Sequence, residues 1–160
     1  MYHSITFQLL SAQNIPITAI NTYRQLHIVP TSRPVIVPPS VKTHYIDIPG
    51  ADGSIDLSDS LASQPRFSNR SGSIDFAVYD DSLYEWPNIY ETIITYLHGQ
   101  KARAVLEDYP SKFYLGRWAM TDWKQEAGML PSLTLSYNLD PFPYDVSTVS
   151  GLQSIINNSW

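Results

Sequence analysis

The chain of 160 residues contains no cysteine, which excludes disulfide bridges and thiolate metal sites. Charged residues are also scarce, at 16 % of the sequence, and the net charge is −5. Basic residues are scattered, and Lys101 with Arg103 is the nearest approach to a basic cluster. Because such a distribution would not neutralise a row of phosphates, we do not expect nucleic-acid binding. A low charge fraction leaves neutral surface, which suits burial against other subunits.

Long apolar runs are missing as well. No segment approaches the roughly 20 apolar residues that span a membrane, and the first seven residues lack the basic and apolar regions of a secretory signal. We therefore expect a soluble protein made in a cytoplasm. A chain of 160 residues suits one domain, which buries about 68–70 % of its unfolded surface.

Alternating and β-branched residues predict a β-rich fold. Residues 9–21 are less regular and fit a loop or a hairpin, and 59–69 fit a loop. Residues 72–79 place Ile74, Phe76 and Val78 on one face, which is typical of a half-buried antiparallel strand. The remaining predicted strands cover residues 4–8, 23–29, 41–48, 102–106, 112–123 and 133–139.

One amphipathic helix is predicted at about residues 85–98. An apolar stripe with helical spacing favours packing of one helix face on a sheet, and His98-Gly99 is a suitable C-terminal stop. Asp80 and Asp81, just before this helix, are read as N-terminal capping residues rather than an acid/base pair. The predicted fold is therefore an antiparallel β-sandwich or split barrel with one flanking helix. The apolar stripe consists of Trp86, Ile89, Tyr90, Ile93, Ile94 and Leu97.

Residues 45–57 predict a strand, a sharp loop and a second short strand. Pro49 cannot donate to a sheet ladder, so strand pairing should stop there. Gly50 and Gly53 permit positive φ, which Asp52 tolerates better than most residues. The segment before these strands carries Pro30, Pro34, Pro38 and Pro39, which indicates an extended arm or a long loop.

Tests for site chemistry are mostly negative. Asp52, Asp56 and Asp59 lack the bidentate Glu of a calcium loop, and the four histidines share no zinc-like spacing. There is no nucleophile elbow and no phosphate-binding glycine loop. We therefore predict no enzyme activity, no metal and no cofactor, although two distant carboxylates of a glycosidase stay possible. Trp118 and Trp123 frame one strand, and core packing is the favoured reading for most aromatic residues.

Taken in order along the chain, a series of short motifs resembles the N-terminal, ring-forming domain of the distal tail protein (Dit) family of long-tailed phages. The resemblance extends from about residue 2 to residue 143. Each motif is weak by itself, but their order is specific. The motifs are His27-Ile-Val-Pro-Thr-Ser-Arg-Pro34, Pro38-Pro39, Lys42, Asp47-Ile-Pro-Gly-Ala-Asp-Gly53, Asp56-Leu57, Asn69-Arg70-x-Gly72, Phe76, Tyr96-Leu-His-Gly-Gln-Lys101, Leu106-Glu-Asp108, Tyr114-x-Gly116-Arg117 and Asn138-Leu-Asp-Pro141.

The resemblance implies a ring of six subunits at the distal end of a phage tail, in a virion or a prophage. Its implied partners are further copies of itself, the tail tube protein, the tape-measure protein and the tail-tip hub protein. Many family members carry a second, C-terminal β domain, which is not expected in this chain. We divide the chain into a domain at 1–144 and a terminal arm or tail at 145–160.

Rigid, pre-ordered segments suit the fixed angle that ring closure demands. We therefore expect two segments, 33–39 and 49–53, at or near a subunit interface; the alternative is that both only close the domain's own sandwich. The candidate interface residues are Arg33, Pro34, Pro38, Pro39, Asp47, Pro49, Gly50, Asp52 and Gly53.

Three other functions stay open from the sequence. One is a carbohydrate-binding module with exposed tryptophans, and another is a tail-associated hydrolase. The third keeps the phage setting and makes the chain a tail-tube protein or another tail-tip ring protein.

Overall fold

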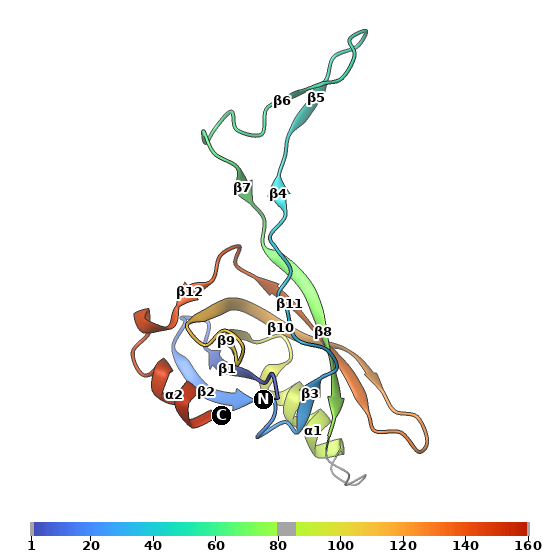
Figure 1. The fold of residues 1–160 in the computed structure, drawn as a ribbon, viewed down its shortest axis with the longest axis vertical. Coiled ribbons are helices and arrows are strands. Elements are labelled where there is room, and N and C mark those ends of the chain that lie inside the picture. The colour runs from blue at the N-terminus through green and yellow to red at the C-terminus, as the bar shows by residue number, and fades with distance from the viewer. Residues whose placement is uncertain (1, 80–85, 160) are drawn as a thin grey trace.

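Residues 2–79 and 86–159 are described by the computed structural model, and most of them lie in or beside one large antiparallel sheet (Figure 1). Its strands follow the order β2-β1-β9-β10-β11-β8-β3, and β12 pairs with β10. The predicted mainly β fold is confirmed, and the sheet does not close into a barrel. The strand bounds are β1 Ile5–Leu10, β2 Pro16–Asn21, β3 Ile28–Pro30, β8 Arg70–Val78, β9 Lys101–Leu106, β10 Lys112–Lys124, β11 Ser132–Leu139 and β12 Tyr144–Asp145.

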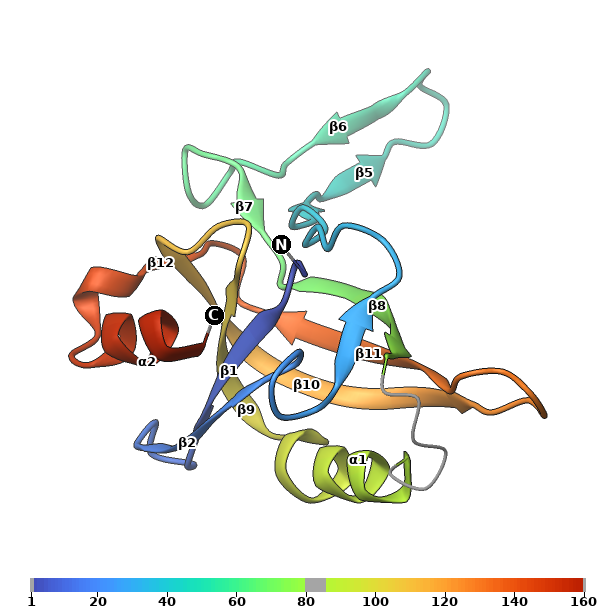
Figure 2. The same cartoon turned by 60° about the horizontal axis from the view of Figure 1, so that its bottom comes forward.

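The sheet curves strongly, so that side chains from both ends of the strand order meet in one core (Figure 2). Phe7 of β1 and Ile28 of β3 belong to the same buried cluster. Trp118 of β10 lies in it, with ring centroids 4.9 Å from Phe7 and 5.1 Å from Tyr137. The predicted alternation of residues 72–79 is confirmed, because Ile74, Phe76 and Val78 are buried while Ser73 and Asp75 are exposed.

Residues 22–26 form turns, so the predicted strand at 23–29 is wrong except for its last residues in β3. The cause is the buried side chain of Asn21, whose Oδ1 accepts hydrogen bonds from the backbone amides of Tyr23 and Arg24. Such a local bond offers the backbone an alternative to the sheet ladder. The loop then crosses to β1, where the Ile5 amide donates to Thr22 Oγ1 at 2.9 Å.

The predicted flanking helix is present as α1 (Trp86–Thr92), which continues as a π-helical turn η1 (Ile93–Leu97). Ile89, Ile93 and Leu97 are buried in the main core, as their spacing predicts. The helix ends at His98, and Gly99 follows with φ +76°. Residue 85 and the proposed capping residues Asp80 and Asp81 lie outside the described residues.

The C-terminal residues form a second hydrophobic cluster against the sheet. After β12, a 3₁₀ turn η2 (Val146–Thr148) leads to helix α2 (Leu152–Ser159). This helix was not predicted, because its few apolar residues stand in a polar segment. The division into a domain at 1–144 and a terminal arm or tail at 145–160 stays a prediction. The cluster consists of Val105, Phe113, Val146, Leu152 and Ile156.

Residues 41–67 leave the sheet as a long two-stranded ribbon, here called the arm (Figure 1). Near the sheet, β4 (Val41–Lys42) pairs with β7 (Arg66–Phe67), and farther out β5 (Tyr45–Asp47) pairs with β6 (Ser54–Asp56). The loop predicted at residues 59–69 is therefore present in the first part of that range, but the prediction missed strand β7.

Truncating the buried face of α2 should destabilise the whole domain. We expect Leu152→Ala to lower the free energy of unfolding by about 2–5 kcal/mol, because it leaves a cavity between helix and sheet. Urea denaturation followed by tryptophan fluorescence measures this loss. Ser154→Ala, on the exposed side of the same helix, is the matched control, and equal effects of the two substitutions would contradict the packing role of α2.

Candidate assembly interface: the hairpin arm and its root

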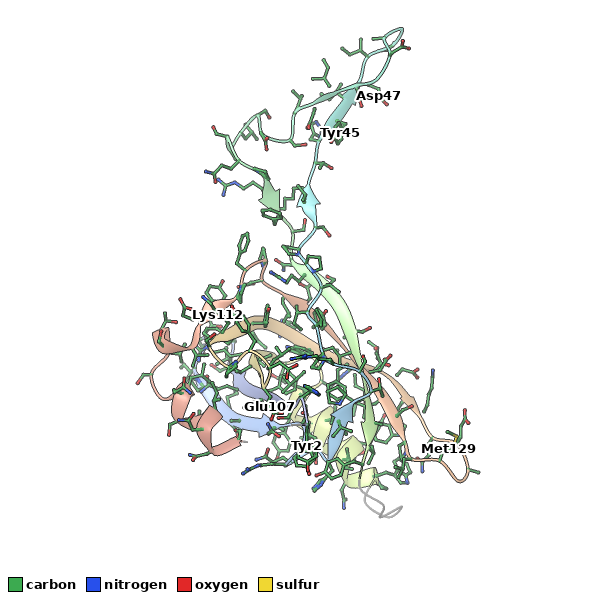
Figure 3. The ribbon with its side chains drawn as sticks, viewed as in Figure 1. Tyr2, Tyr45, Asp47, Glu107, Lys112 and Met129 are labelled. Atoms are coloured by element: carbon green, nitrogen blue, oxygen red, sulfur yellow. The ribbon has the colours of Figure 1, made fainter. Side chains whose placement is uncertain are left out.

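The arm extends away from the rest of the chain, and its side chains point into open space (Figure 3). The register pairs Tyr45 with Asp56, Ile46 with Ile55, and Asp47 with Ser54. Every residue from 41 to 56 is exposed. At about 3.3 Å per residue, the ten residues from 41 to 50 give the arm a reach of about 30 Å.

The tip of the arm has the geometry that the sequence predicts. Pairing stops after Asp47, two residues before Pro49, and turns and bends follow over residues 49–53. Gly50 and Gly53 adopt φ values of +84° and +77°, which a side chain would strain. The strand-loop-strand prediction is therefore confirmed. Asp52 lies in the loop between the two glycines, exposed like its neighbours.

A small hydrogen-bond network fixes the base of this outer hairpin. The Ser58 amide and hydroxyl both donate to Asp56 Oδ1, at 2.9 and 2.5 Å. Ser58 Oγ accepts from the His44 amide at 2.8 Å, and the Leu57 amide donates to the His44 carbonyl. The hydrogen bonds from Ser58 lower the pKa of the Asp56 carboxyl, so this carboxylate is charged at neutral pH and holds the turn.

The arm has no hydrophobic core of its own. No residue between 41 and 67 belongs to either buried cluster of the described chain. Five large apolar side chains of its outer part are instead open to solvent, and Leu61 is 99 % exposed. A two-stranded hairpin of this kind is marginally stable alone in water. The other four are Tyr45, Ile46, Ile48 and Ile55.

The root of the arm, by contrast, is fixed to the domain. Pro34 and Ile36 are buried, and the Val37 amide donates to the Tyr137 hydroxyl at 3.0 Å. Arg70 donates to the carbonyls of Pro141 and Val37, at 2.7 and 3.1 Å. These bonds set the direction in which the arm leaves the sheet. Pro38, which is exposed, and Pro39, which is half-buried, follow directly.

Arg33 is held by the carboxylate of Asp108. Its Nε donates to Asp108 Oδ2, and His3 Nδ1 lies against Asp108 Oδ1, both at 2.7 Å. Burial raises the pKa of Asp108, but the hydrogen bonds from His3 and Arg33 outweigh it, so that the pKa lies below its ordinary value of 3.8. The ionised Asp108 therefore ties the N-terminus and the segment before the arm to the end of β9.

The candidate interface residues thus fall into two groups. Asp47, Pro49, Gly50, Asp52 and Gly53 lie together on the outer arm, whereas Arg33 and Pro34 are held at the root. The root partners Arg70, Asp108 and Tyr137 were not predicted as site residues, although Arg70 and Asp108 stand in motifs of the family resemblance. Their roles depend on bonds between residues 33 to 100 positions apart, for which a single sequence carries no signal.

The described residues contain no cluster of His, Asp and Glu that could hold a metal ion. None of their helices is long and apolar enough to cross a bilayer. Of the tryptophans within 2–79 and 86–159, Trp118 is buried, and Trp86 and Trp123 are half-buried with ring centroids 6.0 Å apart. An exposed tryptophan platform, as a sugar-binding module would use, is not found on the described surface.

Comparison with known proteins gives a fold likeness. No family model and no curated protein matches the chain. A solved structure with a similar fold is the Dit protein (gp 19.1) of phage SPP1, presented as a paradigm of the hub adsorption apparatus in phages that infect Gram-positive bacteria. The TM-score is 0.57 and the sequence identity 18 %, over 89 % of this chain and 51 % of the SPP1 chain. This chain therefore spans about half the length of the SPP1 protein.

Replacing the carboxylate at the root should loosen the arm and change the acid sensitivity of the fold. A carboxyl group with a lowered pKa stabilises the folded state above its unfolded pKa, and that contribution is lost as the pH falls through the folded pKa. For Asp108 the loss should begin near the ordinary value of 3.8 and continue below it. We expect Asp108→Asn to weaken this acid-dependent decrease and to speed amide exchange in residues 33–37.

Urea midpoints between neutral pH and about pH 2, together with hydrogen exchange of the root, measure both effects. Asp122→Asn is the control, because it removes an exposed carboxylate that lies 3.4 Å from Lys124. An Asp108→Asn variant with the same pH profile and exchange rates as that control would contradict the tie at the root.

Proposed function

We propose that this chain is a structural subunit of the tail of a long-tailed phage or prophage. In this proposal six copies form a ring at the distal end of the tail, which surrounds the channel and joins the tail tube to the tail-tip hub. The partners are the tail tube, tape-measure and hub proteins, and the location is the virion tail. The chain has no enzymatic role.

The exposed arm is the observation that carries the proposal. A ribbon with five exposed large apolar side chains on a fixed root gains stability only when another surface covers it, because apolar area is favourable only when removed from water. A different face of a second copy can supply that surface. Contacts of this heterologous kind generate rings when the rotation closes.

The fold likeness supports the phage setting. The similar structure belongs to a phage protein of a hub adsorption apparatus, and the motifs of the sequence independently resemble the same family. A tail-tube protein or another tail-tip ring protein is the alternative in the same setting. A tape-measure gene upstream and a hub gene downstream would separate the distal ring from these positions.

The assembly state tests the proposal directly. We expect native mass spectrometry and sedimentation velocity to detect a closed oligomer of six copies. Its population should rise with protein concentration. A chain that stays monomeric at the highest soluble concentration would overturn the ring. In the matched variant, residues 41–67 are replaced by a Gly-Ser linker, because the Ser68 amide donates to the Ser40 carbonyl at 2.8 Å and the two ends already meet. We expect it to fold and to remain monomeric.

A single substitution at the tip tests the shape of the arm. Gly53 has φ +77° with open space where a side chain would begin, so Gly53→Val adds no clash and only strains the turn, at a cost of about 1–3 kcal/mol. We expect this variant to fold but to assemble less well. Gly128→Val is the matched control, since Gly128 has φ +80° and open space in the loop between β10 and β11. If both variants assemble equally well, the tip of the arm is not part of the interface.

A further inference from the structure

We propose that the acidic outer segment of the arm (residues 43–65) binds a basic groove on the outer face of the sheet of a second copy of this chain. The inference rests on the proposed self-assembly and adds the surface that receives the arm. It is carried by two observations that are independent of each other. One is the concentration of carboxylates on the outer segment of the arm, and the other is a pair of cations without a counterion among the described residues.

Negative charge is concentrated on the outer segment of the arm. Residues 43–65 contain four aspartates and no lysine or arginine, and Lys42 and Arg66 flank this segment at the base of the arm. All four carboxylates are exposed. None of them forms an ion pair within the described residues. The acids that do form ion pairs there are Asp108, Asp122 and Asp145. The four aspartates are Asp47, Asp52, Asp56 and Asp59.

The groove lies across the outer face of the sheet, over β9, β10, β11 and β8. It consists of two adjoining hollows of about 340 and 450 Å³, which share Arg117 and Asn138 in their walls. Lys101 and Asp140 line the first hollow, and Ser71 lines the second. With two cations and one carboxylate, the groove carries a net positive charge.

The two cations of the groove stand directly opposite each other. Lys101 and Arg117 are register partners on β9 and β10, and like charges in this position destabilise a sheet. Neither cation forms an ion pair with a carboxylate of the described residues. Arg117 is held in place, because its Nη1 donates to the Gly99 carbonyl at 3.0 Å. This arrangement is stabilised when an anion binds from outside.

The arm of the same copy does not reach this groove. Asn69, which lies between the arm and β8, lines the first hollow, so the groove begins beside the root. Arg70 fixes the root by its bonds to the carbonyls of Pro141 and Val37. From there the arm extends away from the sheet, as Figures 1 and 3 show. The occupant is therefore the arm of another copy, in the head-to-tail sense that a ring requires.

Charge reversal on the two surfaces separately gives a sharp test. The groove variant carries Lys101→Glu and Arg117→Glu, which replaces one like-charged register pair by another. The arm variant carries Asp47→Lys, Asp52→Lys and Asp59→Lys, and it leaves Asp56 in its turn. We expect each variant alone to fold and to lose self-association about 100-fold or more, because like charges then face each other.

Mixing the two variants should restore assembly. Each arm then meets a groove of opposite charge, so that the variants alternate around a ring with an even number of subunits. Native mass spectrometry with one variant isotopically labelled detects this alternation. Assembly of the wild type should also weaken as the salt rises from about 0.05 to about 0.5 M, since salt screens exposed charges. The control Glu91→Lys, Asp122→Lys and Glu126→Lys changes three exposed acids outside the arm and should assemble like the wild type.

The outcomes separate this inference from the proposed function. A wild type that never associates overturns both. A wild type that associates, together with variants that associate unchanged or a mixture that does not alternate, overturns only the docking of the arm in the groove. If charge reversal prevents folding, Lys101→Gln with Arg117→Gln replaces the groove variant. Unchanged association and unchanged salt dependence of that neutral variant then count against the groove.

Discussion

The constraint on which the rest of this structure depends is that one sheet must bury its inner face against itself. Strands from both ends of the order contribute to a single core around Trp118, and curvature is the only way in which one antiparallel sheet achieves this. The helix α1 and its continuation η1 supply further apolar side chains to the same core. The outer face therefore stays polar wherever α2 does not cover it, and Ser71, Ser73, Ser136 and Asn138 line it.

Tyr137 connects this core to the arm. Its ring packs beside Trp118, while its hydroxyl accepts the amide of Val37 at the root. Gly72 makes the approach possible, because a Cβ at this position would lie 2.6 Å from the Tyr137 hydroxyl. The direction of the arm is thus set by a side chain of the core itself. A rigid root suits the fixed angle that closure of the proposed ring requires.

Local patterns predicted the parts of the fold that local physics decides. The alternation in β8, the apolar stripe of α1 and the turn at Gly50 and Gly53 all follow from periodicity or from backbone freedom. The strand predicted at residues 23–29 was wrong because the Asn21 side chain competes for the backbone amides. Helix α2 gave too weak a pattern, since its stability comes from contact with Val105 and Phe113. The partners at the root of the arm are distant in sequence, so pattern and spacing do not identify them.

In the arm, the interactions that order the ribbon differ from those that would give it affinity for a partner. Paired strands, the Pro49 turn and the Ser58–Asp56 hydrogen bonds order the ribbon before it meets a partner, which reduces the entropy lost on association. In the proposed assembly, its exposed isoleucines and Tyr45 supply apolar area, which is the main source of binding free energy. Surface charges contribute less affinity, but they exclude wrong registers and wrong partners. In the proposed assembly, the four aspartates of residues 43–65 therefore align the arm more than they hold it.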